Sequence, residues 1–294
     1  LFAGSPALGE NWVKASAALE AHGEKAPRIL PDARGNLLAP GEKADSFWRL
    51  TTFLEGSSPP PGDLAAARGA GRALGAAHWA LNTPRPLELL ALPPGDFTNQ
   101  KLPTPEDFAD FPTRYARHPA LHLLKDDWER GAEAARRLPA SPQYRRVFFA
   151  RDLVIHGDPK KDNFLGNGRE YSLIDWDTVS YGDPLIDLGE ICRSMAARRE
   201  RPFFAGESAS ALAAGYRERG LALGSASFRL LPAVIRGLSL NLARRYLSDA
   251  LLESYFIWDK EAYPSLFAQN RARAEALMDL AEELWEREME LLDL

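Results

Sequence analysis

The spacing of apolar side chains predicts mixed structure early in the chain and helices later. Residues 6–22 have the three- and four-residue spacing of a helix with one buried face, at Leu8, Trp12, Ala15 and Leu19. Residues 46–54 are rich in aromatic and β-branched side chains, which predicts a strand. After Pro184 the helical spacing resumes. We predict helices there at residues 185–198, 207–219, 226–253 and 262–291.

Shorter segments have less regular patterns. Residues 28–30 and 36–38 flank a turn with Asp and Gly, which predicts a hairpin. Asp63 predicts the N-cap of a helix that ends near Leu81. Further predictions are an irregular, proline-rich segment at 83–119, a helix at 121–137, a buried strand at 147–155, and a hairpin of 164–165 with 171–174.

One proline-rich segment predicts a domain boundary. Residues 56–62 read GSSPPPG, and this run can continue neither a helix nor a strand ladder. We therefore predict a small N-terminal domain at residues 1–56 and a larger C-terminal domain at residues 57–294.

Composition narrows the class of partners. The net charge is −5, which argues against a nucleic-acid or membrane-surface partner. No stretch approaches the roughly 20 apolar residues of a membrane helix. The single cysteine, Cys192, excludes an internal disulfide and favours a reducing, cytoplasmic setting. Because the chain begins with Leu1 and not Met, we also expect upstream residues in the natural protein.

The segment HGDPKKDN at residues 156–163 contains the candidate chemistry. It lies between a predicted buried strand and a predicted hairpin, whose second strand leads into IDWD at residues 174–177. Asp175 and Asn163 can therefore converge from different loops. Carboxylate and amide oxygens are ligands that suit Mg²⁺. For His156 we expect a structural role, in which the imidazole forms hydrogen bonds with loop carbonyls and does not act as an acid or base.

The spacing resembles the catalytic segments of protein kinases, which contain H-R-D-x-x-x-x-N and then D-F-G. His156-x-Asp158-x-x-x-x-Asn163 has the same spacing. With Gly after His and IDWD in place of DFG, the chain resembles the aminoglycoside phosphotransferase and choline kinase superfamily. The resemblance implies that Asp158 is the catalytic base and that Lys160 contacts the γ-phosphate. It also implies that Asn163 and Asp175 bind Mg²⁺.

A narrower resemblance is to the N-acetylhexosamine 1-kinase branch. Its members tend to read HxDxKxxN and then IDxDTV, as residues 156–179 do here. Residues 47–56 resemble the hinge strand of that branch, which implies that the backbone of Phe53, Leu54 and Glu55 binds adenine. The resemblance further implies sugar contacts from Arg245 and Tyr255.

Two acidic residues complete the predicted substrate site. They are Asp177 in the IDWD segment and Asp249, which follows Asn241 and Arg245 at four-residue intervals on the predicted helix. The same spacing also fits an exposed Arg245–Asp249 pair with no role in binding. Asp183 and Asp187 fit residues that cap and anchor a helix.

These observations predict an α/β (α+β) fold of the protein-kinase-like, two-lobed kind, with a mainly helical C-terminal lobe. The small N-terminal lobe is expected to be incomplete, since no Gly-rich strand pair precedes residue 10. The predicted function is phosphorylation of a small-molecule hydroxyl by ATP and Mg²⁺, with an N-acetylhexosamine-like sugar as the first candidate acceptor. The alternatives are an aminoglycoside, choline or amino-alcohol kinase, and a pseudokinase that acts as a binding module.

Overall fold

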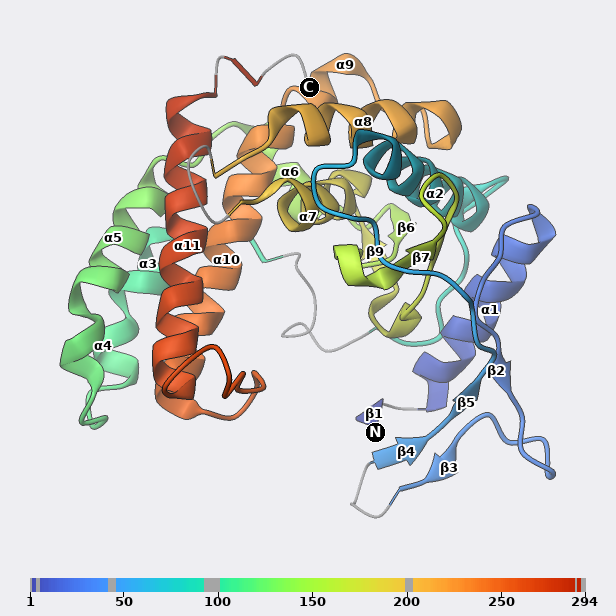
Figure 1. Ribbon diagram of the computed structural model, residues 1–294, viewed down its shortest axis with the longest axis horizontal. Coiled ribbons are helices and arrows are strands. Elements are labelled where there is room, and N and C mark those ends of the chain that lie inside the picture. The colour runs from blue at the N-terminus through green and yellow to red at the C-terminus, as the bar shows by residue number, and fades with distance from the viewer. Residues whose placement is uncertain are drawn as a thin grey trace.

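Short strands and one long helix form the N-terminal part of the protein (Figure 1). The structure is a computed structural model that describes residues 2–3, 6–41, 46–92, 101–198, 203–288 and 290–291. Helix α1 spans Pro6–Ala21. Its predicted buried face is confirmed, with Leu8, Trp12, Ala15 and Leu19 all in the interior.

The strands near α1 are shorter than predicted and pair differently. β4 (Ser46–Trp48) lies between β1 (Phe2–Ala3) and β3 (Ala39–Pro40), while β2 (Ile29–Leu30) pairs with β5 (Leu50–Thr51). The predicted hairpin of 28–30 with 36–38 is therefore wrong, although Asp32 does form the turn between them. The predicted strand at 46–54 is interrupted at Arg49, because β4 and β5 pair with different partners.

Helix α2 (Leu64–Asn82) begins the larger part of the molecule. Asp63 caps it as predicted, because its carboxylate accepts hydrogen bonds from the backbone of Ala65 and Ala66. Glycines allow α8 (Gly206–Arg219) to pack directly on α2. A Cβ on Gly71 would lie 2.0 Å from the Leu212 carbonyl oxygen, which no backbone adjustment short of separating the helices could accommodate.

The middle of the chain is more helical than predicted. The segment 83–119 contains α3 (Pro105–Ala109) and α4 (Phe111–Arg114), and the helix predicted at 121–137 is present as a 3-10 turn followed by α5 (Lys125–Arg136). The strand predicted at 147–155 is wrong over its first half. Ser141 caps a helix, α6 (Pro142–Phe149), and only β6 (Leu153–Ile155) is extended.

Two antiparallel strand pairs carry the candidate site. β6 pairs with β9 (Ser180–Gly182), and the predicted hairpin is confirmed as β7 (Phe164–Gly166) with β8 (Tyr171–Leu173). Helix α7 (Pro184–Ala196) follows β9, and Asp183 caps it.

The remaining helices confirm the predicted helical C-terminal region. They are α8, the short α9 (Ser225–Phe228), α10 (Leu231–Leu252) and α11 (Leu266–Glu286). α10 and α11 pack along their length and share a hydrophobic cluster with α3, α4 and α5, on the left of Figure 1. No helix among the described residues has the length and hydropathy to cross a membrane.

Candidate active site

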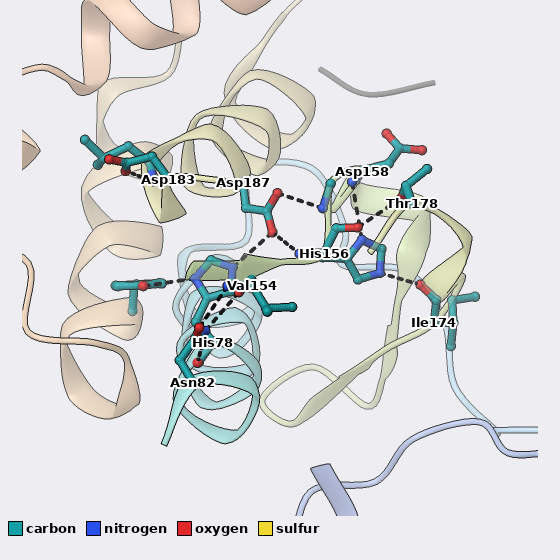
Figure 2. Close-up of polar contacts among 12 residues, drawn as sticks. His78, Asn82, Val154, His156, Asp158, Ile174, Thr178, Asp183 and Asp187 are labelled. Atoms are coloured by element: carbon teal, nitrogen blue, oxygen red, sulfur yellow. Dashed lines mark hydrogen bonds and ion pairs between the residues drawn. The ribbon is translucent and has the colours of Figure 1, made fainter. Parts of the chain in front are cut away.

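Helix α7 holds the loop that follows β6. One carboxylate oxygen of Asp187 accepts a hydrogen bond from the His156 backbone at 2.7 Å, and the other accepts one from the Gly157 backbone at 3.0 Å (Figure 2). Further along α7, Ser194 Oγ accepts from the Lys161 backbone at 2.8 Å. The spacing of Asp187 and Ser194 puts both on one helix face, so a single helix fixes both ends of the loop.

A buried polar network orients Asp187 in turn. The same oxygen that binds His156 accepts from His78 Nε2 at 2.9 Å, and the other His78 nitrogen lies 3.0 Å from the Tyr216 hydroxyl. Since a carboxylate can only accept, His78 Nε2 carries a proton and donates it to Asp187. Asn82, one turn after His78, pairs through both amide atoms with the Val154 backbone and so fixes β6.

His156 fits the structural role predicted for it. Its Nε2 donates to the Ile174 carbonyl at 2.9 Å, and its Nδ1 lies 3.4 Å from the Asp158 backbone nitrogen (Figure 2). The Thr178 hydroxyl donates to its carbonyl. The imidazole therefore ties the 156–163 loop to the end of β8, with both ring nitrogens engaged by the backbone.

Asp158 lies beside Lys160, with Nζ 3.0 Å from a carboxylate oxygen. Burial raises the pKa of Asp158, and the Glu190 carboxylate on α7 raises it further, while Lys160 opposes them. Burial would lower the pKa of Lys160, but the Asp158, Asp175 and Glu190 carboxylates offset this and the net shift is upward. Lys160 thus stays a cation, and Asp158 has an increased affinity for a proton.

Asn163 and Asp175 are brought together at the open end of the β7–β8 hairpin, where the Ile174 backbone donates to the Asn163 carbonyl at 3.0 Å. Asn163 Nδ2 donates to the Asp158 carbonyl, which leaves Oδ1 free of donors among the described residues. Asp175 has a left-handed backbone (φ 66°), and its carboxylate forms no hydrogen bond or ion pair within the described part of the chain. Unengaged oxygens of this kind fit a Mg²⁺ ion.

Asp177 is engaged by the N-terminal part of the molecule. The Arg49 guanidinium donates through Nη1 to one carboxylate oxygen and through Nη2 to the other, the latter at 2.7 Å. The same guanidinium lies over the Trp12 ring, 4.1 Å from its centroid. Both side chains of the pair are largely buried, with 17% and 23% of their surfaces exposed. The predicted substrate contact of Asp177 would have to share the carboxylate with Arg49.

The predicted adenine-binding segment follows β5. Residues 53–55 are outside any strand, and the Phe53 side chain is exposed. Just beyond them, the backbones of Ser57 and Gly166 exchange hydrogen bonds of 2.9 and 3.1 Å. The chain leaving the small lobe is thereby joined to the tip of the β7–β8 hairpin. The backbone of 53–55 is available to a ligand, as adenine recognition would require.

Two predicted substrate residues, Arg245 and Tyr255, lie together near the end of α10. The Arg245 guanidinium is 5.1 Å from the centroid of the Tyr255 ring. Val234 and Leu238 on the same helix pack against Gly189 of α7, and Arg245 lies on that face because it is seven residues after Leu238. Arg245 therefore continues the face that α10 presents to α7.

Asp249 has a different environment. Its carboxylate accepts from the backbone of Ser254, Tyr255 and Phe256 and from the Asn270 amide. Burial would raise the pKa of Asp249, but these donors outweigh it and hold the pKa below its usual value. The side chain is buried and forms no pair with Arg245. We therefore propose that Asp249 holds the turn after α10.

Several site residues were not predicted from the sequence. Arg49 lies in an ordinary strand pattern, and Arg193 forms a buried pair with Glu190, which lies near Asp158. One pattern in the sequence could have indicated the role of this helix. Asp187, Glu190 and Ser194 are spaced so that three polar side chains lie on one face of an otherwise apolar helix that begins with Asp-Pro.

A loop bearing Asp158 and Lys160, followed by a hairpin flanked by Asn163 and Asp175, has the arrangement expected of a kinase-like phosphotransferase. The small lobe of short strands and the helical lobe complete that fold. Residues 3–222 match the Phosphotransferase enzyme family (APH), so the chain belongs to this family and is a small-molecule phosphotransferase. No curated protein sequence matches it.

Solved structures support the fold. The aminoglycoside phosphotransferase of Alicyclobacillus acidocaldarius is similar, with a TM-score of 0.64 at 16% identity, over 98% of this chain and 86% of that one. A microcompartment-associated aminopropanol kinase gives a TM-score of 0.59 at 18% identity, over 97% and 83%. Amicoumacin kinase in complex with AMP-PNP, Ca²⁺ and Ami gives 0.54 at 14% identity, over 91% and 76%.

Proposed function

We propose that this chain transfers the γ-phosphoryl group of Mg·ATP to a hydroxyl of a small molecule, with an N-acetylhexosamine-like sugar as the first candidate. The observation that carries the proposal is the grouping of Asp158, Asn163 and Asp175 at one end of the β7–β8 hairpin. Asn163 and Asp175 offer oxygens that nothing in the described chain engages. Similar kinases whose structures are solved include one bound to a nucleotide analogue and Ca²⁺.

The contacts support the proposed roles. The acceptor oxygen forms a bond to the γ-phosphorus as the bond to ADP breaks, and the hydroxyl proton passes to Asp158, whose raised pKa suits a base. Lys160 lies beside Asp158 and supplies a positive charge for the phosphoryl oxygens. Asn163 and Asp175 would hold Mg²⁺, which neutralises phosphate charge when bound. The backbone of residues 53–55 would bind adenine.

The acceptor surface favours a neutral or acidic molecule over the cationic acceptors named for the similar aminoglycoside and aminopropanol kinases. Near the end of α10 the half-buried Arg245 lies against the Tyr255 ring, while the Asp249 carboxylate is occupied by backbone donors. A cationic acceptor would meet a guanidinium there and no free carboxylate from these residues. A guanidinium can instead donate to two sugar oxygens at once.

Two variants test the division of roles. Asp158→Asn removes the base, so phosphoryl transfer to a panel of sugars should fall by about 10²–10⁴ while Mg·ATP affinity is retained. Asp175→Asn should weaken Mg·ATP binding, measured by titration calorimetry. Asp162→Asn is the matched control, because Asp162 is exposed in the same loop. Equal loss of nucleotide affinity in the first two variants would contradict these roles.

The pseudokinase alternative gives a different pattern. A binding module would bind nucleotide yet transfer no phosphate to any acceptor or to water, in the wild type as in Asp158→Asn. Hydrolysis that depends on Asp158 identifies the enzyme.

A further inference from the structure

Arg244 lies within electrostatic range of two other arginines, Arg114 and Arg245. Arg244 and Arg245 are consecutive on α10, and Arg114 is the last residue of α4. Phe111, one turn before Arg114, belongs to the same hydrophobic cluster as Leu240 and Leu247 of α10, so the two helices lie against a common core. In Figure 1, α4 and α10 belong to the same group of helices.

Arg244 has no carboxylate partner for its charge among the described residues. Its Nε atom is buried and has no hydrogen-bond acceptor, and its Nη2 atom has only a 3.4 Å contact with the Asn241 side chain. Across the described residues, none of the three guanidinium groups forms an ion pair. Leaving a buried charged donor unsatisfied is costly, which makes Arg244 a place where a ligand oxygen would be strongly favoured.

The carboxylate that acts on Arg244 is already engaged elsewhere. Asp107 of α3 accepts from Lys101 Nζ at 2.5 Å and from the Thr104 backbone at 3.0 Å, because it closes the capping box of its own helix. Burial lowers the pKa of Arg244, Asp107 opposes this, and Arg114 and Arg245 lower it further. The groups that face Arg244 thus leave an excess of positive charge.

The position of the cluster relates it to the reaction. Arg245 lies on the face of α10 that packs on α7 through Val234 and Leu238. α7 is the helix whose Asp187 and Ser194 hold the loop with the proposed base. A group bound by Arg244 and Arg245 would therefore lie next to the face of α10 that carries the proposed acceptor residue Arg245.

We propose that Arg244, with Arg245 beside it and Arg114 at the rim, forms an anion-binding site for a carboxylate or phosphate group. Guanidinium groups bind both anions through paired hydrogen bonds. The group can belong to the acceptor, such as a sugar acid or sugar phosphate, or to a free acidic regulator. Binding of an acidic acceptor rests on the proposed transfer reaction, whereas binding of a free regulator does not.

Direct binding of inorganic phosphate tests the site without any turnover. Calorimetric titration is done on the full chain in the presence of saturating AMP-PNP and Mg²⁺, so that phosphate cannot enter the nucleotide site. We expect phosphate to bind, and Arg244→Gln to weaken its affinity by about tenfold or more, since it removes a charged hydrogen-bond donor. Arg117→Gln is the matched control, because Arg117 is exposed three residues after Arg114. Arg245→Gln, a second variant, should also weaken binding.

The two sources are separated by acceptor assays. Glucose, glucuronate and glucose 6-phosphate are compared as acceptors and as inhibitors of the wild type and of Arg244→Gln. A rise in KM in the variant for the acidic sugars alone assigns the site to the acceptor. If phosphate binding depends on Arg244 but only neutral sugars react as acceptors, the site is assigned to a free acidic regulator. Equal phosphate affinity in the wild type and in Arg244→Gln, with nucleotide binding intact in both, would overturn the site and leave the proposed transfer reaction standing.

Discussion

The Arg49 guanidinium, between β4 and β5, donates to both carboxylate oxygens of Asp177, two residues after Asp175. Arg49 belongs to the small lobe, whereas Asp177 follows the β7–β8 hairpin. The guanidinium lies over the Trp12 ring of α1, which limits its rotation. The small lobe therefore contacts the segment that carries a proposed metal ligand.

Because of this contact, we expect Arg49 and Asp177 to be coupled. Arg49→Ala and Asp177→Ala should each lower the affinity for Mg·ATP, and the double variant should lose less than the sum. The coupling energy should be about 1–3 kcal/mol, as for a partly buried bidentate pair. Arg49→Lys should keep more nucleotide affinity than Arg49→Ala, because lysine keeps the positive charge but not the paired donors.

The matched control for this cycle is Arg28 with Glu20, an ion pair in the same lobe with both side chains well exposed. Its variants should leave nucleotide affinity unchanged. Additive effects at Arg49 and Asp177, with a loss of melting temperature only, would show that the pair stabilises the fold without positioning Asp175.

Asp249 should contribute stability that depends on pH. Its folded pKa is below the usual value, so its contribution is complete above the unfolded pKa and is lost as pH falls through the folded pKa. Thermal unfolding of the wild type should therefore show a decline below about pH 4. Asp249→Asn should lower the free energy of unfolding by about 2–4 kcal/mol at pH 7. The amide NH₂ group would replace a carboxylate oxygen that accepts two hydrogen bonds, and would leave those two donors without an acceptor. Unfolding of this variant should depend less on acid.

Glu261→Gln is the control for Asp249, because Glu261 is exposed in the loop that follows α10. An acid transition in Asp249→Asn as large as that of the wild type would mean that other carboxylates dominate acid unfolding.

Gly157 should tolerate no side chain. It has a φ of +89°, and a Cβ would lie 2.3 Å from the Thr178 carbonyl oxygen. Gly157→Ala should therefore displace the loop from Asp187 and abolish transfer. Gly168→Ala is the control that tests backbone strain without a steric clash, since Gly168 has a φ of +96° but open space around it. That control should cost only about 1 kcal/mol and keep activity.

Arg245→Ala should raise the acceptor KM by about tenfold or more and leave nucleotide binding and melting temperature little changed, because Arg245 contacts the Tyr255 ring and no buried carboxylate. Lys260→Ala is the control, since Lys260 stacks on Trp258 in the next loop. A fall in melting temperature with an unchanged acceptor KM would assign Arg245 a structural role.

The family and the kinase-like fold could be predicted from the sequence because the His156–Asn163 spacing and the terminal helical periodicity are local patterns. The strand pairing of the small lobe could not, since strands of two or three residues are set by long-range partners. Helix α6 was missed because its apolar residues, Tyr144, Val147 and Phe148, merge into those of β6 without a break. The partners of Asp177 and Asp249 depend on contacts that no spacing in the chain reveals.

The hydrogen bonds that shape the 156–163 loop have a consequence for biosynthesis. They come from Asp187 and Ser194, and through His78 from Tyr216, far downstream, while Asn82, far upstream, fixes the strand that leads into the loop. On the ribosome, the loop emerges long before Tyr216 does. A nascent chain interrupted before α8 would thus carry every proposed catalytic side chain together with Asp187 and Ser194, but His78 would lack its tyrosine partner. Completion of the buried network that orients Asp187 therefore depends on residues synthesised well after the loop itself.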